Sequence, residues 1–183
     1  LKGLRAQLAV KVERLEQALS LLTSFTEDMA RRGKSVESAW ISRSVQAPTP
    51  EEVMALGLGA GDRVARLERV RRSDGVPLAI ERASLPTQVL PDPEAVETSL
   101  YALLETYGLR PVRAVQRISA ANLGPRDAEL LGVTPGAAGL RIERIGYLGN
   151  GRVVEFTRSI YRGDAYDFAV ELTLTPGMER AQA

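Results

Sequence analysis

The residues whose chemistry points most clearly to a function are two arginines on one predicted strand. Residues 63–86 are predicted to form two strands joined by Ser73-Asp74-Gly75, a short loop of residues that favour hairpin turns. Because side chains alternate along a strand, Arg69 and Arg71 share a face with apolar residues. An unpaired charge on a core-facing strip costs on the order of several kcal/mol, so both guanidinium groups need a partner.

The sequence allows two kinds of partner for these guanidinium groups. With Gly75 in the left-handed position of a three-residue loop, the register places Arg69 opposite Ala79, two residues from Glu81. An internal ion pair of Arg69 or Arg71 with Glu81 or Glu68 is the first possibility. The second is a bound phosphate or carboxylate, which guanidinium groups hold well.

Two predicted helix starts offer further groups for an anion. Residues 24–27 have the Ser and Glu spacing of a capping box, so one helix begins near Phe25 and Thr26. Another begins at Ser99, with Tyr101 two residues later. Hydroxyl groups and the unpaired backbone N–H groups of helix starts can hold a phosphate or carboxylate.

A second set of polar side chains suits a different part of a ligand. Glu81, Glu155 and Tyr161 can exchange hydrogen bonds with hydroxyl or amide groups. An anion at one end and hydroxyl groups at the other describe a sugar phosphate. Two carboxylates also admit glycoside hydrolysis, but carboxylates on separate strands have no separation that the sequence can predict.

Composition narrows the classes of function. The 183 residues include no cysteine and no histidine, which excludes thiol chemistry and removes the commonest general base and metal ligand. We therefore expect binding rather than catalysis, with no catalytic residue, no metal and no cofactor. The net charge of +1 gives no electrostatic footprint for nucleic acid. No apolar run reaches membrane-spanning length and no signal peptide opens the chain, so we expect a soluble, cytoplasmic protein without a membrane partner.

The remaining elements follow from hydrophobic periodicity and turn residues. The start of the chain has the apolar spacing of an amphipathic helix, and Asn150-Gly151 is the strongest hairpin signal. The predicted helices span residues 1–22, 25–33, 50–57, 99–108 and 125–131; the strands outside the first hairpin span 36–47, 112–121, 138–149, 152–161 and 166–174, and a frayed tail begins at 176.

One segment of the chain recurs. Leu56-Gly57-Leu58, Gly61 and Arg66-Leu67-Glu68-Arg69-Val70 return as Leu131-Gly132-Val133, Gly136 and Arg141-Ile142-Glu143-Arg144-Ile145. This repeat indicates a duplicated unit of helix and hairpin, and two such units predict a largely antiparallel sheet with packed helices, an α+β fold. Glu81 and Glu155 would then approach a shared cleft from pseudo-symmetric positions.

Four runs of sequence together carry a family resemblance: LTSFTEDMARRG, LERVRRSDGVPLAIERASLP, SLYALLETYG and VEFTRSIYRGDAYDF. They resemble the effector-binding (UTRA) domain of HutC-subfamily GntR transcription regulators. The resemblance implies a chorismate-lyase-like α+β fold, with a ligand cleft between an antiparallel sheet and helices. It also implies a homodimer and a winged helix-turn-helix domain before this one. Residues 1–22 would be the linker from that domain, 23–175 the effector-binding domain and 176–183 the tail.

The resemblance also implies roles for individual residues. In members that sense amino-sugar phosphates, such as N-acetylglucosamine-6-phosphate, the matching positions divide into two groups. Those that hold the phosphate are Phe25, Thr26, Arg69, Arg71, Ser99 and Tyr101, and those that hold the sugar are Glu81, Glu155 and Tyr161. The effector would change the spacing of the DNA-binding domains and so the affinity for operator DNA. Alternatives are urocanate or another carboxylate as effector, an enzyme like the lyase that shares the fold, and a purely structural dimerisation domain.

Overall fold

A six-stranded antiparallel sheet forms the centre of the computed structural model, which describes residues 15–18, 22–170 and 172. The strands lie in the order β2-β3-β4-β7-β6-β5. Their bounds are β2 Glu37–Gln46, β3 Val64–Ser73, β4 Val76–Pro86, β5 Arg113–Asn122, β6 Ala138–Tyr147 and β7 Val153–Arg162. The two predicted hairpins, β3-β4 and β6-β7, therefore meet in the middle of the sheet through β4 and β7.

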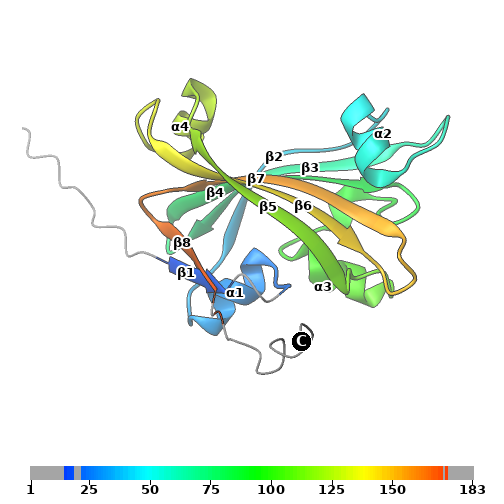
Figure 1. Ribbon diagram of the computed structural model, residues 1–183, viewed down its shortest axis with the longest axis horizontal. Coiled ribbons are helices and arrows are strands. Elements are labelled where there is room, and N and C mark those ends of the chain that lie inside the picture. The colour runs from blue at the N-terminus through cyan, green and yellow to red at the C-terminus, as the bar shows by residue number, and fades with distance from the viewer. Residues whose placement is uncertain (1–14, 19–21, 171, 173–183) are drawn as a thin grey trace, which may run out of the picture.

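Short helices cover both faces of this sheet. They are α1 Phe25–Arg31, α2 Pro50–Leu56, α3 Leu100–Thr106 and α4 Pro125–Leu131, with a 3-10 turn at Pro93–Ala95. Figure 1 shows α1 and α3 below the sheet, and α2 and α4 above its two ends. The predicted α+β fold is confirmed. No helix within the described residues is long and apolar enough to cross a membrane.

Local capping chemistry accounts for where the helices begin and end. Ser24 and Glu27 form the predicted capping box at α1: the Ser24 hydroxyl accepts the Glu27 N–H, and the Glu27 carboxylate accepts the Ser24 N–H. Helices α2 and α4 both have proline at their start and end at a glycine in the left-handed conformation, Gly57 and Gly132. The matching ends of α2 and α4 agree with the sequence repeat.

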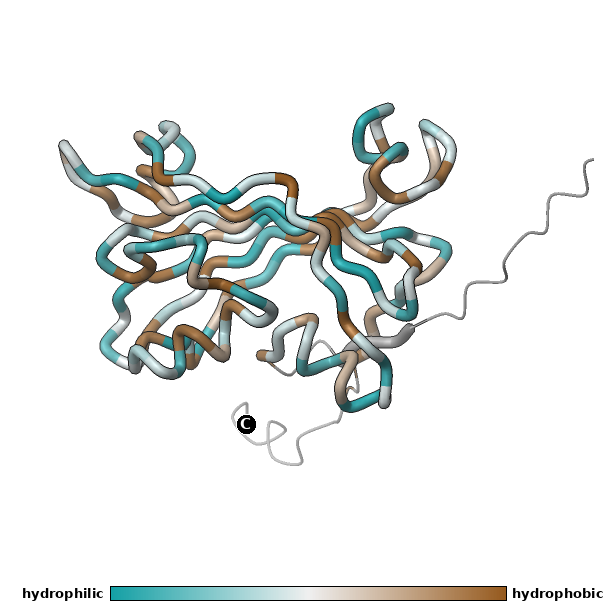
Figure 2. The backbone as a smooth tube through the Cα atoms, turned by 180° about the vertical axis from the view of Figure 1, so that it is seen from behind, coloured by the Kyte–Doolittle hydropathy of each residue, from teal (hydrophilic) through white to brown (hydrophobic). Residues whose placement is uncertain are grey.

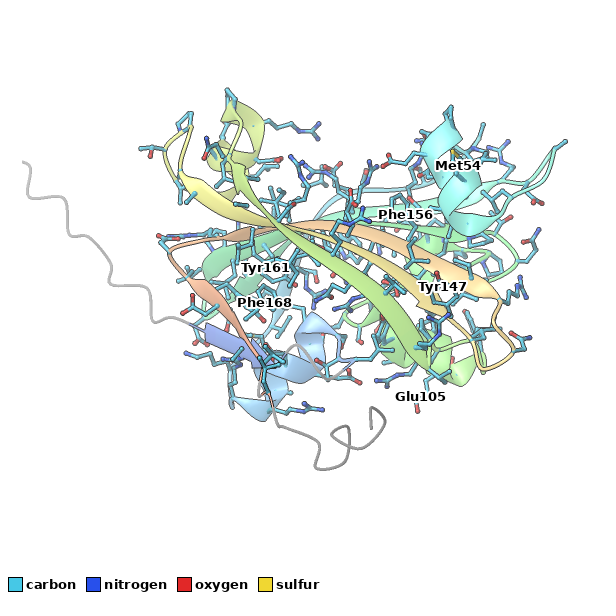
Figure 3. All side chains as sticks on the ribbon, in the orientation of Figure 1. Met54, Glu105, Tyr147, Phe156, Tyr161 and Phe168 are labelled. Atoms are coloured by element: carbon cyan, nitrogen blue, oxygen red, sulfur yellow. The ribbon has the colours of Figure 1, made fainter. Side chains whose placement is uncertain are left out.

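The two faces of the sheet bury different clusters. Side chains alternate along each strand, so Phe156 and Tyr161 of β7 point to opposite faces. Figure 3 shows Phe156 with Met54 on the α2 side, and Tyr161 with Phe168 on the α1 side. Hydrophilic and hydrophobic segments accordingly alternate along the strands in Figure 2. The face toward α1 and α3 is the one that carries the candidate site.

Within the described residues, the predicted N-terminal helix is wrong. Residues Leu15–Ala18 form a strand, β1, which pairs in parallel with β8, Tyr166–Ala169. Pairing with β8 overrides the local helical pattern, because a short apolar segment can serve in either element. Residues 1–14 and 19–21 of that prediction lie outside the described residues. The last strand, predicted over 166–174, spans Tyr166–Ala169, and residues 171, 173 and 174 of that prediction lie outside the described residues.

The register of the central hairpin also differs from the prediction by two residues. Arg69 lies opposite Glu81, and Arg71 lies opposite Ala79. The turn is the two-residue Asp74-Gly75, with φ of 51° and 76°. A register shift between Arg71 and Arg72 then takes up an extra residue on β4. Because the register differs by an even number of residues, every side chain keeps its predicted face, but the residue opposite Arg69 changes.

Candidate functional site

A small cavity lies between the α1 and α3 layer and the middle of the sheet. Its floor consists of short side chains on β7, Thr157 and Ser159, while longer charged side chains enter from β3 and β4 on one side and from β6 on the other. The free space is about 40 Å³. The lining residues are Thr23, Phe25, Arg69, Glu81, Leu100, Tyr101, Ile142, Arg144, Glu155, Thr157, Ser159 and Tyr161.

At one end of this cavity Arg69 forms an ion pair with Glu81. Its Nη2 and Nε atoms lie 2.6 Å and 2.8 Å from Glu81 Oε1. The Arg69 guanidinium also stacks on Trp40, 4.9 Å from the ring centroid, and donates to the Thr98 carbonyl. Burial by itself would raise the pKa of Glu81, but the charges of Arg69 and Arg71 outweigh burial and lower it. The internal ion pair weighed from the sequence is thus confirmed for Arg69.

Arg71 has a different environment. It is 1% exposed, and its guanidinium donates to Thr26 Oγ1 at 2.6 Å, and to Ser38 Oγ and the Thr98 carbonyl at 3.2 Å each. The central carbon of the Arg71 guanidinium, Cζ, lies 5.0 Å from the centroid of the Phe25 ring. No carboxylate of the described residues forms an ion pair with it, and its Nε has no hydrogen-bond partner. Burial is the main reason why the pKa of Arg71 falls to about 10. Arg71 is therefore a buried cation whose hydrogen-bond partners are all neutral, and Glu81 acts on it only through its charge.

The second carboxylate of the cavity, Glu155, is held by two hydroxyl groups. Tyr101 donates to its Oε2 at 2.7 Å and Thr157 to its Oε1 at 2.6 Å. The side chain is buried, and this burial raises its pKa despite the opposing charge of Arg144. Gly146 leaves room for it, because a Cβ there would lie 2.9 Å from Glu155 Oε2. Burial and the Glu155 charge also raise the pKa of the Tyr101 hydroxyl.

An aromatic cluster closes the end of the cavity next to α1. The rings of Phe25 and Tyr161 lie 6.3 Å apart, and Tyr161 packs on Tyr166 and Phe168 of β8 at 4.6 Å and 5.8 Å. The Tyr166 hydroxyl donates to Asp28 of α1. Figure 3 shows Tyr161 and Phe168 together beside β8. Burial raises the pKa of Tyr161 to about 12, so its hydroxyl is a neutral hydrogen-bonding group.

The structure brings together most of the residues predicted for the site. Six of the nine line the cavity: Phe25, Arg69, Glu81, Tyr101, Glu155 and Tyr161. Thr26 and Arg71 do not line it. Thr26 bonds to Arg71, which shares Ser38 and Thr98 with Arg69. Ser99 is the N-cap of α3, as predicted, and its hydroxyl accepts the Ala102 N–H. The Ser99 side chain is not part of the lining.

Several lining residues were missing from the predicted site, above all Arg144. Its guanidinium donates to the Thr23 carbonyl at 3.2 Å and to Gln116 Oε1 at 3.0 Å and 2.7 Å. The sequence repeat contained the signal, since it aligns Arg144 with Arg69. Thr157 and Ser159 could have been found too, because they alternate with Glu155 and Tyr161 along one strand face.

The expected pseudo-symmetry of the two glutamates is only approximate. Arg69 lies opposite Glu81 in the first hairpin, while its repeat partner Arg144 lies opposite Thr157 in the second. Glu155 is two residues away from the equivalent position. Both glutamates line the same cavity, yet they do so from unequal places.

The arrangement is suited to binding an anionic polar molecule. Within the described residues, no group of three or more His, Cys, Asp or Glu side chains could hold a metal ion. The free space of about 40 Å³ has room for only a few water molecules. Since pockets for small molecules are typically about 300 Å³ or larger, a larger ligand requires some of the lining residues to move.

Comparison with known proteins gives a consistent set of relatives. Residues 31–167 match the family described as the UTRA domain. The chain is 36% identical over 162 residues to the HTH-type transcriptional repressor NagR of Bacillus subtilis, covering 87% of this chain and 67% of that protein. It is 34% identical over 150 residues to the HTH-type transcriptional repressor PhnF of Mycolicibacterium smegmatis, covering 79% and 61%. The chain thus spans about two thirds of the length of these curated relatives.

Solved structures agree with the sequence relatives. The crystal structure of the effector domain of PhnF from Mycobacterium smegmatis superposes with a TM-score of 0.81 at 30% identity. The match covers 87% of this chain and 99% of that one. The fold of this chain is therefore similar, almost end to end, to a domain that was solved by itself.

Proposed function

The chain belongs to the UTRA family and is the effector-binding domain of a GntR/HutC-type transcription regulator, and we propose that its effector is a phosphorylated sugar. An amino-sugar phosphate such as N-acetylglucosamine-6-phosphate is the best candidate. In this proposal the effector occupies the enlarged cavity, with its phosphate toward Arg71 and its sugar toward Glu155. The family resemblance seen in the sequence supports this orientation.

The observation that carries the proposal is the environment of Arg71. A buried guanidinium whose hydrogen-bond partners are all neutral costs free energy, and Glu81, which attracts Arg71 by its charge, is already ion-paired with Arg69. A phosphate supplies the missing charge and accepts bidentate hydrogen bonds from guanidinium groups. Thr26 and Ser99 add hydroxyl groups, and Arg69 adds a second guanidinium, which Glu81 already neutralises in part.

Three further polar side chains of the cavity suit the sugar. Glu81 and Glu155 are acceptors for sugar hydroxyl or amide groups, and the neutral Tyr161 hydroxyl both donates and accepts. The Tyr101 hydroxyl, which the resemblance assigns to the phosphate, donates to Glu155 in this structure. In this proposal a ligand with one anionic group and several uncharged polar groups suits the cavity better than a symmetric dianion.

Effector binding would act on DNA through the rest of the protein. We propose that residues 1–22 connect this domain to a winged helix-turn-helix domain, that 23–175 form the effector-binding unit, and that the whole protein is a homodimer. Outward movement of α1 and α3 around the effector would change the placement of the DNA-binding domains on operator half-sites. Operator affinity then changes by the difference in effector binding between the two states.

The test is calorimetry of the 183-residue chain with N-acetylglucosamine-6-phosphate, glucosamine-6-phosphate, the unphosphorylated sugars, urocanate, chorismate and inorganic phosphate. Binding of the phosphorylated sugars but not of the free sugars supports the proposal. Binding of urocanate alone would keep the effector domain and replace the phosphate by a carboxylate, which guanidinium groups also hold. Turnover of chorismate would instead indicate a lyase. Absence of any binding would leave a structural dimerisation domain.

A further inference from the structure

The face of the sheet opposite the cavity is open in its middle. Figure 1 shows α2 and α4 above the two ends of the sheet. A groove of about 310 Å³ lies on this face, lined by residues of β2, β3, β4 and β7 and of α2. The side chains of Arg82, Glu143 and Arg158 point to this face from neighbouring strands, and they are 30%, 35% and 41% exposed. The middle of this face is therefore accessible to a partner.

Charges of both signs share this face. They form ion pairs with nitrogen–oxygen distances from 2.6 Å to 3.7 Å: Arg66–Glu52, Arg82–Glu68, Arg82–Asp127, Arg117–Glu143 and Arg158–Glu51. Nucleic acids and acidic peptides are attracted to surfaces where positive charge is clustered, so alternating charges suit neither. A surface that carries both signs is instead complementary to a second copy of itself, because a two-fold axis can bring each sign against the other.

Arg158 has the weakest compensation in the middle of this face. It lies directly opposite Arg82 across β4 and β7, and like charges in such positions destabilise a sheet. Arg82 pairs with two carboxylates, whereas the printed ion pair of Arg158 is with Glu51, whose side chain is 54% exposed. Water screens an exposed pair of this kind. A further carboxylate near Arg158 would therefore stabilise the middle of the sheet.

We propose that this face is an interface between two copies of this chain, in which Arg158 of each copy forms an ion pair with the partner subunit's Glu143. Arg158 and Glu143 are neighbours on β7 and β6 and point to the same face. A two-fold axis in the plane between the two faces, midway between these residues, places each over the other, so both ion pairs form together. The interface deepens the homodimer of the proposed function, on which its biological role rests.

The size of the face agrees with such an interface. Five strand spacings of about 4.8 Å and strands of about 33 Å give roughly 800 Å² per copy. A standard interface buries about 800 Å² on each partner. Met54 on α2 is 86% exposed, and Val115, on this face of the edge strand β5, is 53% exposed. A second copy would remove apolar surface of these side chains from water.

The test is sedimentation velocity of the 183-residue chain over a range of protein concentrations. Wild type is expected to form a dimer. Arg158→Glu and Glu143→Arg each place like charges against the partner, so each should weaken the dimer by about tenfold or more. The double variant exchanges the two charges in every copy and should regain most of the lost affinity. Arg152→Glu makes the same charge change at the exposed turn between β6 and β7 and should have no effect.

A second measurement does not require the charge variants to fold. The chain has no cysteine, so Val115→Cys supplies a single exposed thiol on the proposed interface. Its reaction with a thiol reagent should slow severalfold as the protein is concentrated. Tyr107→Cys, at an exposed position next to α3 on the other side of the sheet, is the control and should react at a constant rate.

Each alternative result would overturn the inference. A wild-type chain that stays monomeric has no such interface, and a dimer that both single variants leave intact uses another face. Constant labelling of Val115→Cys in a dimer would lead to the same conclusion. If the double variant regained no affinity, Arg158 would not meet Glu143. Calorimetry with phosphorylated sugars is a separate readout: a monomer that binds them keeps the proposed effector, and a dimer that binds none keeps the interface.

Discussion

Arg69 and Glu81 lie directly opposite each other on β3 and β4, and their side chains form an ion pair of 2.6 Å at one side of the cavity. Two residues along the same strand, Arg71 has no such partner among the described residues. The difference follows from position, since Arg71 lies opposite Ala79. Of these two neighbouring arginines on one strand face, Arg69 is thus neutralised by an ion pair, whereas Arg71 is a buried cation without one.

The first prediction separates these two roles. Arg71→Met should abolish binding of a phosphorylated ligand, a loss of roughly 2–5 kcal/mol for a desolvated charge contact. It should leave the thermal unfolding of the unliganded chain unchanged or raise it, because removing a buried cation also removes its desolvation cost. Calorimetry and thermal denaturation measure the two effects. A large loss of stability together with retained binding would mean that Arg71 is structural.

The second prediction concerns the hydroxyl group that bonds to Glu155. Tyr101→Phe leaves one oxygen of a buried carboxylate without its donor, which should lower the free energy of unfolding by about 1–3 kcal/mol. Tyr107→Phe, on the exposed side of the same segment, is the control and should have no effect. Chemical denaturation of both variants gives the comparison. Equal stability of the two would show that water replaces the lost donor at no cost.

The third prediction uses the close approach of Gly146 to Glu155. In Gly146→Ala the new Cβ would meet Glu155 Oε2 at 2.9 Å and Pro111 Cγ at 3.0 Å, so the carboxylate must shift. Overpacking of this kind typically costs about 1–3 kcal/mol, and displacement of Glu155 should also weaken effector binding. Gly149→Ala is the matched control, since its nearest contact is an ordinary 3.9 Å. Similar behaviour of both variants would contradict the tight packing at Gly146.

The fourth prediction is a pH dependence that arises away from the cavity. Buried Glu52 would have a raised pKa from burial alone, but hydrogen bonds from Arg66 and Ser84 lower it to about 2. Because the folded pKa lies below the unfolded value, the unfolded state takes up the proton first. This contribution to stability, of order 3 kcal/mol at most, is present above about pH 5 and is lost as the pH falls toward 2.

Denaturation of wild type and Glu52→Gln at several pH values tests this dependence. Wild type should lose stability more steeply than the variant between pH 5 and 2, whereas both curves should run parallel above pH 5. Glu51→Gln is the control on the same helix, because Glu51 is exposed. If Glu52→Gln lost stability between pH 5 and 2 as steeply as wild type, that loss would arise from other carboxylates.

Local rules were enough to predict most of the elements from the sequence. The capping box at Ser24, the glycine ends of α2 and α4, and the Asn150-Gly151 turn depend on residues only a few positions apart. Alternation along a strand likewise placed Arg69 and Arg71 on one face without knowledge of any partner. For the same reason, six of nine predicted site residues reached the cavity lining: their strand face and helix start were locally determined.

Only the tertiary structure decided which groups meet. The two-residue turn and the register shift between Arg71 and Arg72 together make Glu81, rather than Ala79, the partner of Arg69, and pairing with β8 turns Leu15–Ala18 into a strand. Arg144 joins the site because β6 lies beside β7, far from β3 in the chain. Residue types and short spacings specify what each side chain can do, whereas register and strand order, set by contacts between distant segments, specify which charges are neutralised.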